Sequence, residues 1–192
     1  MPKNNLTFDE QSHRYFLDGN FIPSVTQIID SVFPFEGHGL AAERSADFGK
    51  AVHKAIELDI QGRLNWATVD DAILPYIKQW EKIYSHLNIL TVRCQVETML
   101  VSKKYKFAGR VDLIHEGLVI DIKTGQKKPT HLIQIAAYKH LVSKTLKVKV
   151  EKALLVYLNG SDEMPEIVKG RSQDFATFLA CLEIYNWRNS NG

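Results

Sequence analysis

Three strand-like segments joined by very short links constrain the fold of this chain most strongly. They span residues 91–101, 107–114 and 118–124, and their links hold five and three residues. Links this short have no room for a crossover, so the segments must pair as an antiparallel meander. A helix predicted over 129–145 separates them from a fourth strand over 148–158. That connection is long enough for a crossover, so the fourth strand can lie parallel to a central one.

Helical patterns surround the meander. We expect a β-hairpin within the first 22 residues, because Asp18-Gly19-Asn20 is a turn signal between strand-like runs. Ser24 can cap a short helix over 25–33. Other helices are predicted over 40–61 with a break near Gly49, over 68–87 with Pro75 as a kink or break, and over 172–187. The segment 34–39 holds one Pro and two Gly, which favours a mobile connection.

The order of these elements predicts an α/β (α+β) fold. A central mixed four-stranded sheet would be flanked by helices and preceded by an N-terminal β-hairpin and helix. A length of 192 residues allows one domain with a small appendage. We expect residues 1–40 to form that appendage and residues 41–192 to form the core.

Charge is distributed unevenly along the chain. The formal net charge is only +2, but residues 101–152 hold twelve Lys or Arg and four Asp or Glu. This segment therefore carries +8, and the rest of the chain carries −6. A local basic surface can attract phosphate groups even where the total charge is small, so a nucleic-acid partner stays open.

Several other classes of protein are poor matches to the sequence. Cys94 and Cys181 are the only cysteines, which excludes an iron–sulfur cluster or a zinc ribbon held by cysteines. So few cysteines favour a reducing compartment. The chain has neither an apolar run long enough to span a membrane nor a signal-peptide core. We therefore expect a soluble intracellular protein, located in the cytoplasm and without membrane contact.

The second and third strands carry the residues with the clearest chemistry. Strand alternation puts Asp112 on one face of its strand and places Asp121 and Lys123 together on one face of the next. If the strands pair around the turn at 115–117, both carboxylates lie on one sheet face. Ionised carboxylates on a mostly apolar sheet need compensation, which a divalent cation with oxygen ligands such as Mg²⁺ or Mn²⁺ supplies. The alternative is a solvated sheet face with an ordinary ion pair.

Neighbouring residues favour the first interpretation. Gly109 permits close backbone approach on the second strand. Gln134 and Tyr138 are spaced i, i+4, so they share one face of the helix that follows the third strand. Three lysines at 103, 104 and 106 cap the first hairpin, where a solvated tip is the default interpretation.

These motifs resemble a known family. Gly109-Arg110-Val111-Asp112, then Asp121 to Gly125, then Gln134 and Tyr138 resemble the PD-(D/E)xK nuclease superfamily, in its RecB-like, phage-type exonuclease branch, which includes the mitochondrial genome maintenance exonuclease. The helix 49–57 with His53 is similar to the first motif of that branch. Ser24-Val25-Thr26 is similar to its N-terminal element.

The resemblance implies a restriction-endonuclease-like core and a role for each matching residue. Asp112 and Asp121 would be metal-binding carboxylates, and Lys123 would orient the attacking water and stabilise charge. His53, the Ile122 backbone carbonyl and, less firmly, Glu97 would add metal ligands to one or two Mg²⁺ or Mn²⁺ ions. A structural histidine on an amphipathic helix is the alternative for His53. The DNA-binding residues would be Ser24, Thr26, Arg110, Lys127, Gln134 and Tyr138.

The implied activity is a metal-dependent DNA exonuclease that acts on single-stranded DNA or DNA ends, in recombination, repair or phage DNA metabolism. Two alternatives stay open. One is a structure-specific endonuclease of the same superfamily, and the other is a non-catalytic DNA-binding protein on a nuclease scaffold. The sequence does not determine the polarity of digestion, the preference for DNA over RNA or the oligomeric state.

Overall fold

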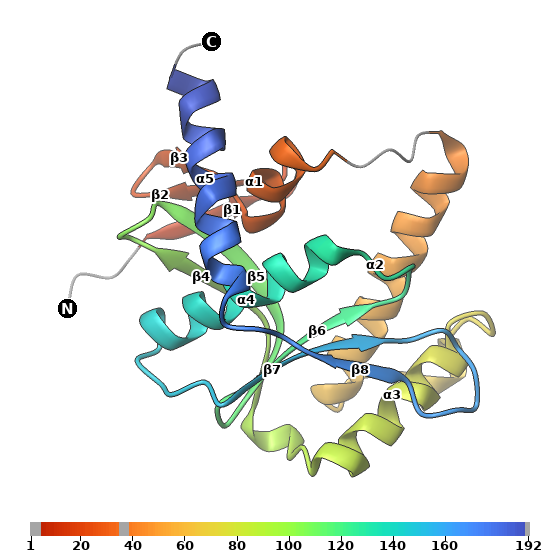
Figure 1. The fold of residues 1–192 in the computed structure, drawn as a ribbon. Coiled ribbons are helices and arrows are strands. Elements are labelled where there is room, and N and C mark those ends of the chain that lie inside the picture. Colours follow the sequence, from red (N-terminus) through yellow and green to blue (C-terminus); the bar gives the residue numbers. More distant parts are fainter. Residues whose placement is uncertain (1–4, 35–38, 191–192) are drawn as a thin grey trace.

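A computed structural model describes residues 5–34 and 39–190 of the chain. The predicted connection over 34–39 therefore lies mostly outside the described residues. The strands form a five-stranded sheet and a separate three-stranded sheet near the N-terminus. Figure 1 shows helices on both faces of the larger sheet. The strands are β1 (Leu6–Asp9), β2 (Arg14–Leu17), β3 (Asn20–Ile22), β4 (Cys94–Ser102), β5 (Phe107–His115), β6 (Leu118–Lys123), β7 (Lys152–Tyr157) and β8 (Glu166–Lys169). The helices are α1 (Val25–Val32), α2 (Leu40–Ile60), α3 (Leu74–Leu87), α4 (Pro129–Thr145) and α5 (Asp174–Ser190), with short 3₁₀ turns at Trp66–Thr68 and Thr91–Arg93.

The central sheet has the strand order β4-β5-β6-β7-β8. The predicted meander is confirmed, since β4 pairs with β5 and β5 with β6 in antiparallel fashion. The predicted crossover is also confirmed, because β7 lies parallel to β6. The expected number of four strands is wrong. The fifth strand, β8, has only four residues at the sheet edge and follows a segment rich in turn residues, so no run of strand-like residues indicated it.

Two apolar layers enclose the sheet. On one face, α2 and α3 cover a cluster that includes Val52, Trp80 and Ile120. On the other face, α4, together with α1 and α5, covers a cluster that includes Ile135 and Phe178. Figure 1 shows α4 lying across the sheet between β6 and α5. The central strands are buried on both faces, as expected for strands covered by helices on both sides.

The N-terminal segment forms a three-stranded antiparallel sheet that continues into α1. It packs on the β4–β5 hairpin through Tyr15 and Ile22, which contact Val101 and Ala108 in a small apolar cluster. The Ala108 amide donates to the carbonyl of Pro23 at 3.0 Å. These contacts hold the start of α1 directly beside β5.

Ser24 caps α1, as predicted. Its hydroxyl accepts from the Gln27 amide at 3.0 Å, and the Gln27 side chain accepts from the Ser24 amide at 2.9 Å. This reciprocal pair is a capping box. It orients the first turn of α1 toward β5.

Two predicted helix features are wrong, each for a local reason. The helix expected from residue 68 begins at Leu74, because Asn65 and Asp70 cap separate turns before it. Pro75 then lies in the first turn, where its missing N–H is not needed. No break occurs at Gly49 in α2. A Cβ there would lie 3.1 Å from the Thr124 hydroxyl, so the glycine brings α2 close to the end of β6.

Among residues 5–34 and 39–190, no helix combines the length and the apolar character that a membrane span requires.

The turn between β5 and β6 yields a first prediction. Gly117 has φ +85°, and a Cβ there would lie 2.8 Å from the Lys149 carbonyl oxygen. The free energy of unfolding of Gly117→Ala, measured by urea denaturation, should therefore fall by roughly 1–3 kcal/mol. Gly125→Ala is the matched control, because its Cβ would meet nothing within 4 Å and should change stability by less than about 0.5 kcal/mol. Equal stability of the two variants would contradict the prediction.

Candidate active site

The strands β5 and β6 separate at the residues that the sequence singles out. Their ladder pairs Leu113 with Ile120 and does not extend to the next two residues, Asp112 and Asp121. The Asp112 Oδ2 atom instead accepts a hydrogen bond from the Ile122 amide at 2.7 Å. Amide and carbonyl of one strand residue point to the same edge, so the Ile122 carbonyl also faces this opening. The separation leaves the Asp112 carboxylate and the Ile122 carbonyl close to the buried Asp121 carboxylate.

A distortion in the neighbouring strand β4 brings in a third carboxylate. Glu97 has φ +47°, an unusual value for a strand residue, and it has no partner in the β4–β5 ladder. Val111 belongs to the core under α4, whereas Leu113 belongs to the core under α2 and α3. Regular alternation would place both on one face. The change of face between them lets Glu97 and Asp112 point together.

Helix α2 contributes His53 to the same space. Its Nδ1 atom lies 3.5 Å from Asp112 Oδ2. One ligand atom each from His53, Glu97 and Asp112 lies within 4.8 Å of the others, so these three are placed to bind a metal ion. The close approach of α2 at Gly49 positions this histidine. The geometry therefore includes Glu97 in the group of potential ligands.

Asp121 belongs to a second, adjoining arrangement around Lys123. The Lys123 Nζ atom lies 2.7 Å from Asp121 Oδ2 and donates a hydrogen bond of 2.8 Å to Gln134 Oε1. The Gln134 amide nitrogen donates in turn to the Tyr138 hydroxyl at 3.0 Å. Tyr138 approaches β5 because residue 109 is glycine, where a Cβ would lie 2.8 Å from its ring. Gln134 on helix α4 thus contacts the lysine from one side, and Asp121 contacts it from the other.

The electrostatics of these residues show a surplus of negative charge. Asp121 is 2% exposed, and burial raises its pKa although Lys123 opposes the shift. The nearby Asp112 carboxylate raises the pKa of Asp121 further. Burial and then Asp112 raise the pKa of Glu97 to about 7. Carboxylates that repel one another in a poorly solvated place need a cation.

A bound divalent cation fits this set. Among the described residues, the buried Asp121 Oδ2 atom has no hydrogen-bond partner of good geometry, despite its ion pair with Lys123. The donors around it are carboxylates, an imidazole and a carbonyl, which suit Mg²⁺ or Mn²⁺. The alternative of a solvated ion pair is wrong for Asp121, because its carboxylate is buried.

Sequence reasoning did not single out Tyr157, which pairs in register with Lys123. Its hydroxyl lies 3.0 Å from His131 Nδ1. Burial, with Lys123 adding to it, lowers the pKa of His131 to about 4, so the ring is neutral at pH 7. The feature that could have revealed Tyr157 is the parallel pairing of β7 with β6, which places Tyr157 beside Lys123.

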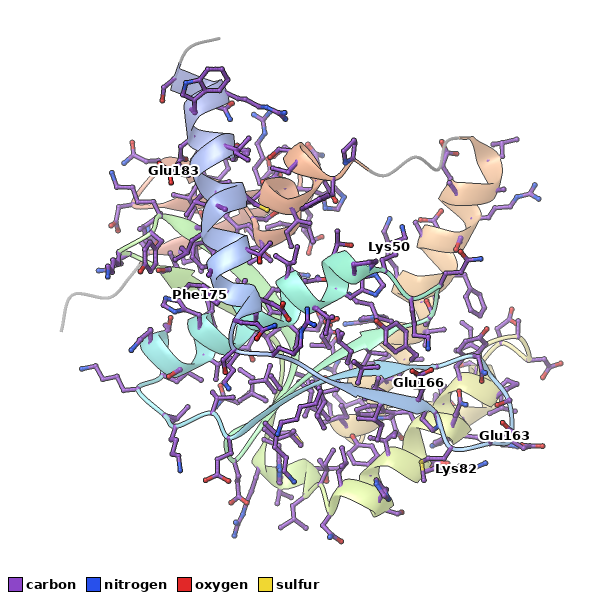
Figure 2. All side chains as sticks on the ribbon, in the orientation of Figure 1. Lys50, Lys82, Glu163, Glu166, Phe175 and Glu183 are labelled. Atoms are coloured by element: carbon purple, nitrogen blue, oxygen red, sulfur yellow. The ribbon has the colours of Figure 1, made fainter. Side chains whose placement is uncertain are left out.

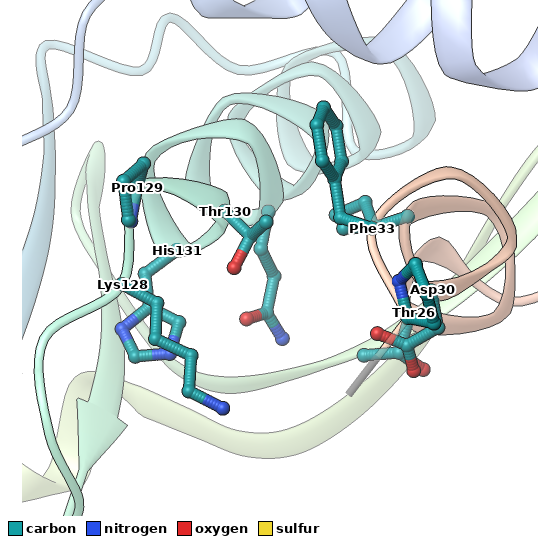
Figure 3. Close-up of a pocket in the computed structure, with 10 residues that line it drawn as sticks. Thr26, Asp30, Phe33, Lys128, Pro129, Thr130 and His131 are labelled. Carbon is teal, nitrogen blue, oxygen red and sulfur yellow. The ribbon is translucent and has the colours of Figure 1, made fainter. Parts of the chain in front are cut away.

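Three hollows surround the site. One of about 720 Å³ contains His53, Glu97 and Asp112, and one of about 320 Å³ lies beside Tyr138 under the N-terminal sheet. The third, of about 510 Å³, is shown in Figure 3, where Thr26, Asp30 and Phe33 face residues 128–131 at the start of α4. Gln134 lines it as well, so it opens beside the Lys123 arrangement.

The remaining predicted DNA-binding residues occupy different settings. Thr26 is exposed and lines two of the hollows. Ser24 is buried, and its hydroxyl is engaged in the cap and with Thr26 at 3.0 Å. Arg110 lies 3.9 Å from Glu97 with its guanidinium over the Phe8 ring, between two hollows. Lys127 is paired with Glu166 at 2.6 Å, so part of its charge is already compensated.

Comparison with known proteins decides the family. The family model of the PD-(D/E)XK nuclease superfamily matches residues 65–186, well over half of the chain. The chain belongs to the PD-(D/E)XK nuclease superfamily. Superfamily members use divalent metals and act on nucleic acid, which agrees with the His53, Glu97 and Asp112 group.

The match covers only part of the site of this superfamily member. It includes Asp112, Asp121, Lys123, Gln134 and Tyr138, and it begins after His53 and the N-terminal sheet. The structure alone places those earlier residues beside the matched core.

A solved structure supports the fold. A crystal structure from Eubacterium rectale, named "Putative exonuclease", aligns with a TM-score of 0.54 over 86% of this chain and 73% of that chain. The two sequences are 11% identical, so the similarity concerns the fold. No curated protein sequence matches the chain.

The charge of Glu97 yields a second prediction. Its pKa of about 7 exceeds the ordinary value of 4.5, so protonated Glu97 stabilises the metal-free fold at low pH. This contribution is lost as pH rises from about 4.5 through about 7. In the presence of a chelator, Glu97→Gln should therefore flatten the fall in free energy of unfolding between about pH 5 and 8. At about pH 8 the free energy of unfolding of Glu97→Gln should exceed that of the parent by roughly 1–3 kcal/mol.

Chemical denaturation across this pH range measures the effect. Glu183→Gln, at an exposed position on α5, is the matched control and should follow the parent. If Glu97→Gln loses stability as steeply as the parent, Glu97 is not the titrating group.

Proposed function

We propose that this protein is a Mg²⁺- or Mn²⁺-dependent DNA exonuclease of the RecB-like, phage-type branch. One observation carries the proposal: Lys123 is held between Asp121 and Gln134, next to the potential metal ligands His53, Glu97 and Asp112. Superfamily membership supports a hydrolase of the deoxyribonuclease type. Phosphodiester hydrolysis requires carboxylates that can bind a metal ion, a fixed positive charge and a space for the phosphate.

The proposed mechanism assigns a task to each residue. His53, Asp112, Asp121 and the Ile122 carbonyl would hold one or two cations, with Glu97 as a further ligand. The chemistry that such a cation supplies, when bound, is polarisation of the phosphodiester and activation of the attacking water. Lys123 would orient that water and present positive charge where negative charge develops on the phosphate.

The hydrogen bonds of Lys123 make it suited to that task. Gln134 and Asp121 fix its ammonium group from two sides, so little reorganisation is needed when charge develops. Burial keeps the pKa of Tyr138 well above its ordinary value, so the hydroxyl that accepts from Gln134 carries no charge. The low pKa of His131 keeps a second positive charge away from Lys123.

Action from a free end of single-stranded DNA is supported by the surroundings of the site. The N-terminal sheet and the start of α1 border two hollows, one beside Tyr138 and one beside Gln134. Thr26 and Arg110 line these spaces and would contact the DNA backbone. The name of the Eubacterium rectale structure points to the same activity. A cytoplasmic location is proposed from the composition of the sequence, and a role in recombination, repair or phage DNA metabolism is proposed from the resemblance.

Removal of the central residues gives a third prediction. Asp121→Asn and Lys123→Ala should each cleave end-labelled single-stranded DNA at least about 100-fold more slowly than the parent in Mg²⁺ or Mn²⁺. Asp121→Asn should still fold, because burial already disfavours the charged carboxylate. Asp71→Asn and Lys78→Ala change exposed residues outside the site and serve as matched controls. A well-folded Asp121→Asn variant that cleaves as fast as the parent would contradict the proposal.

The same assay distinguishes the three candidate activities. An exonuclease degrades linear single-stranded DNA and leaves a circle intact, whereas an endonuclease cuts both. Labels at the 5′ and 3′ ends in turn report the polarity. Binding of DNA without cleavage in any metal would favour the non-catalytic alternative.

Metal affinity gives a fourth prediction. His53 lies 3.5 Å from Asp112, and a ligand at this position should contribute directly to cation binding. His53→Ala should therefore bind Mn²⁺ at least about tenfold more weakly, as measured by calorimetry. His86→Ala, at an exposed position on α3, is the control. Unchanged Mn²⁺ affinity in His53→Ala would mean that the histidine is structural.

A further inference from the structure

A basic surface with aromatic side chains lies away from the site described above. We call it the lysine–aromatic surface. It combines the turn between β4 and β5, the C-terminal half of α4 and the start of α5. Its residues are Lys104, Tyr105, Lys139, His140, Lys144 and Phe175. Figure 2 shows Phe175 at the end of α5 that lies next to α4.

Three rings form the centre of this surface. The His140 ring stacks on Phe175 with centroids 4.2 Å apart and planes inclined by 11°. Tyr105 meets His140 edge to face at 5.4 Å and lies 6.1 Å from Phe175. All three side chains are half-buried, so each retains some exposed ring surface. Packing against one another holds them rigid.

A hollow lies on each side of His140. The first, of about 400 Å³, is lined by the β4–β5 turn together with His140 and Lys144. The second, of about 440 Å³, lies between α4 and α5 and also contacts His140 and Lys144. Hollows of this size beside exposed rings can each receive a nucleobase.

The charge of the surface is uniformly positive. Among the described residues, no carboxylate forms an ion pair with Lys104, Lys139 or Lys144, and no acidic residue lines either hollow. Asp174, which precedes Phe175 in the sequence, is buried and accepts two hydrogen bonds from Arg171. Burial lowers the pKa of His140, and Lys144 and Lys104 lower it further. A surface of this charge suits an anionic partner.

The surface is separate from the active site. Helix α4 serves the site through Gln134 and Tyr138, and it serves this surface through residues 139–144. Tyr138 and Lys139 are neighbours in the sequence, but their side chains line different hollows. The hollows of the two regions share no lining residue.

We propose that the lysine–aromatic surface is a second binding site for single-stranded nucleic acid. The lysines would contact the phosphates, and bases would stack against Tyr105 and His140 in the two hollows. Positive charge combined with exposed aromatic rings is the general chemistry of single-strand binding without sequence preference. The inference rests on the proposed function in one respect: the strand bound here would be the substrate whose end enters the active site.

A fifth prediction tests this binding without cleavage. In a chelator, the affinity for a fluorescently labelled dT20 should be about three- to tenfold lower for Lys139→Gln/Lys144→Gln than for the parent. The dependence of log K on log salt should become less steep by about 1.4, since each phosphate contact on a single strand contributes about 0.7. Lys78→Gln/Lys152→Gln removes the same charge from exposed positions on α3 and β7, and should leave both quantities unchanged.

A second measurement uses the unmodified protein. Ultraviolet cross-linking of a single strand that carries 5-bromodeoxyuridine, followed by mass spectrometry, should identify peptides with Tyr105 or His140. Cross-links confined to residues around Lys123 would overturn the proposal. Unchanged dT20 affinity and salt dependence in Lys139→Gln/Lys144→Gln would also overturn it. An acidic peptide that needs these lysines while dT20 does not would show that the surface binds protein instead.

The two proposals fail separately. If the parent binds dT20 through these lysines but cleaves nothing in Mg²⁺ or Mn²⁺, the proposed nuclease function fails and the second site stands. If the parent cleaves DNA and Lys139→Gln/Lys144→Gln binds dT20 like the parent, the second site fails and the function stands.

Discussion

The burial of the Asp121 carboxylate is the constraint on which the arrangement of this protein depends. A carboxylate that is 2% exposed cannot remain ionised without a partner, and Lys123 at 2.7 Å provides only one charge. Lys123 in turn donates to Gln134, and Gln134 donates to Tyr138, so this chain of hydrogen bonds joins α4 to the end of β6. The neighbouring Asp112 carboxylate adds a further negative charge, which favours a bound cation at the same place.

The opening between β5 and β6 depends on the same requirement. Regular pairing would occupy the Ile122 amide with a backbone acceptor, whereas here the Asp112 side chain takes that bond. The strands therefore diverge where the carboxylates lie, and β4 adds Glu97 through an unusual backbone conformation. Small residues make room on both sides, with Gly109 under Tyr138 and Gly49 beside Thr124. The site is thus a local exception to sheet regularity that the two apolar layers stabilise.

Much of the fold could be predicted from local pattern. The meander, the crossover through α4 and the capped start of α1 were confirmed, because short links, periodicity and Ser24 act over a few residues. Strand β8 and the start of α3 were not, since a short edge strand and competing caps at Asn65 and Asp70 leave weak signals. The candidate site residues were found through motif spacing, whereas Tyr157 needed the register of β7.

By itself, the sequence determined the order of the main elements, the candidate site residues and the basic character of residues 101–152. The alternation and spacing of residues are properties of the chain itself, so contacts between distant residues do not alter them. Only the tertiary structure decided that His53, Glu97 and Asp112 meet, because they come from three elements brought together by core packing. It also divided the basic residues between two regions, since α4 contributes Gln134 and Tyr138 to the active site and residues 139–144 to the lysine–aromatic surface.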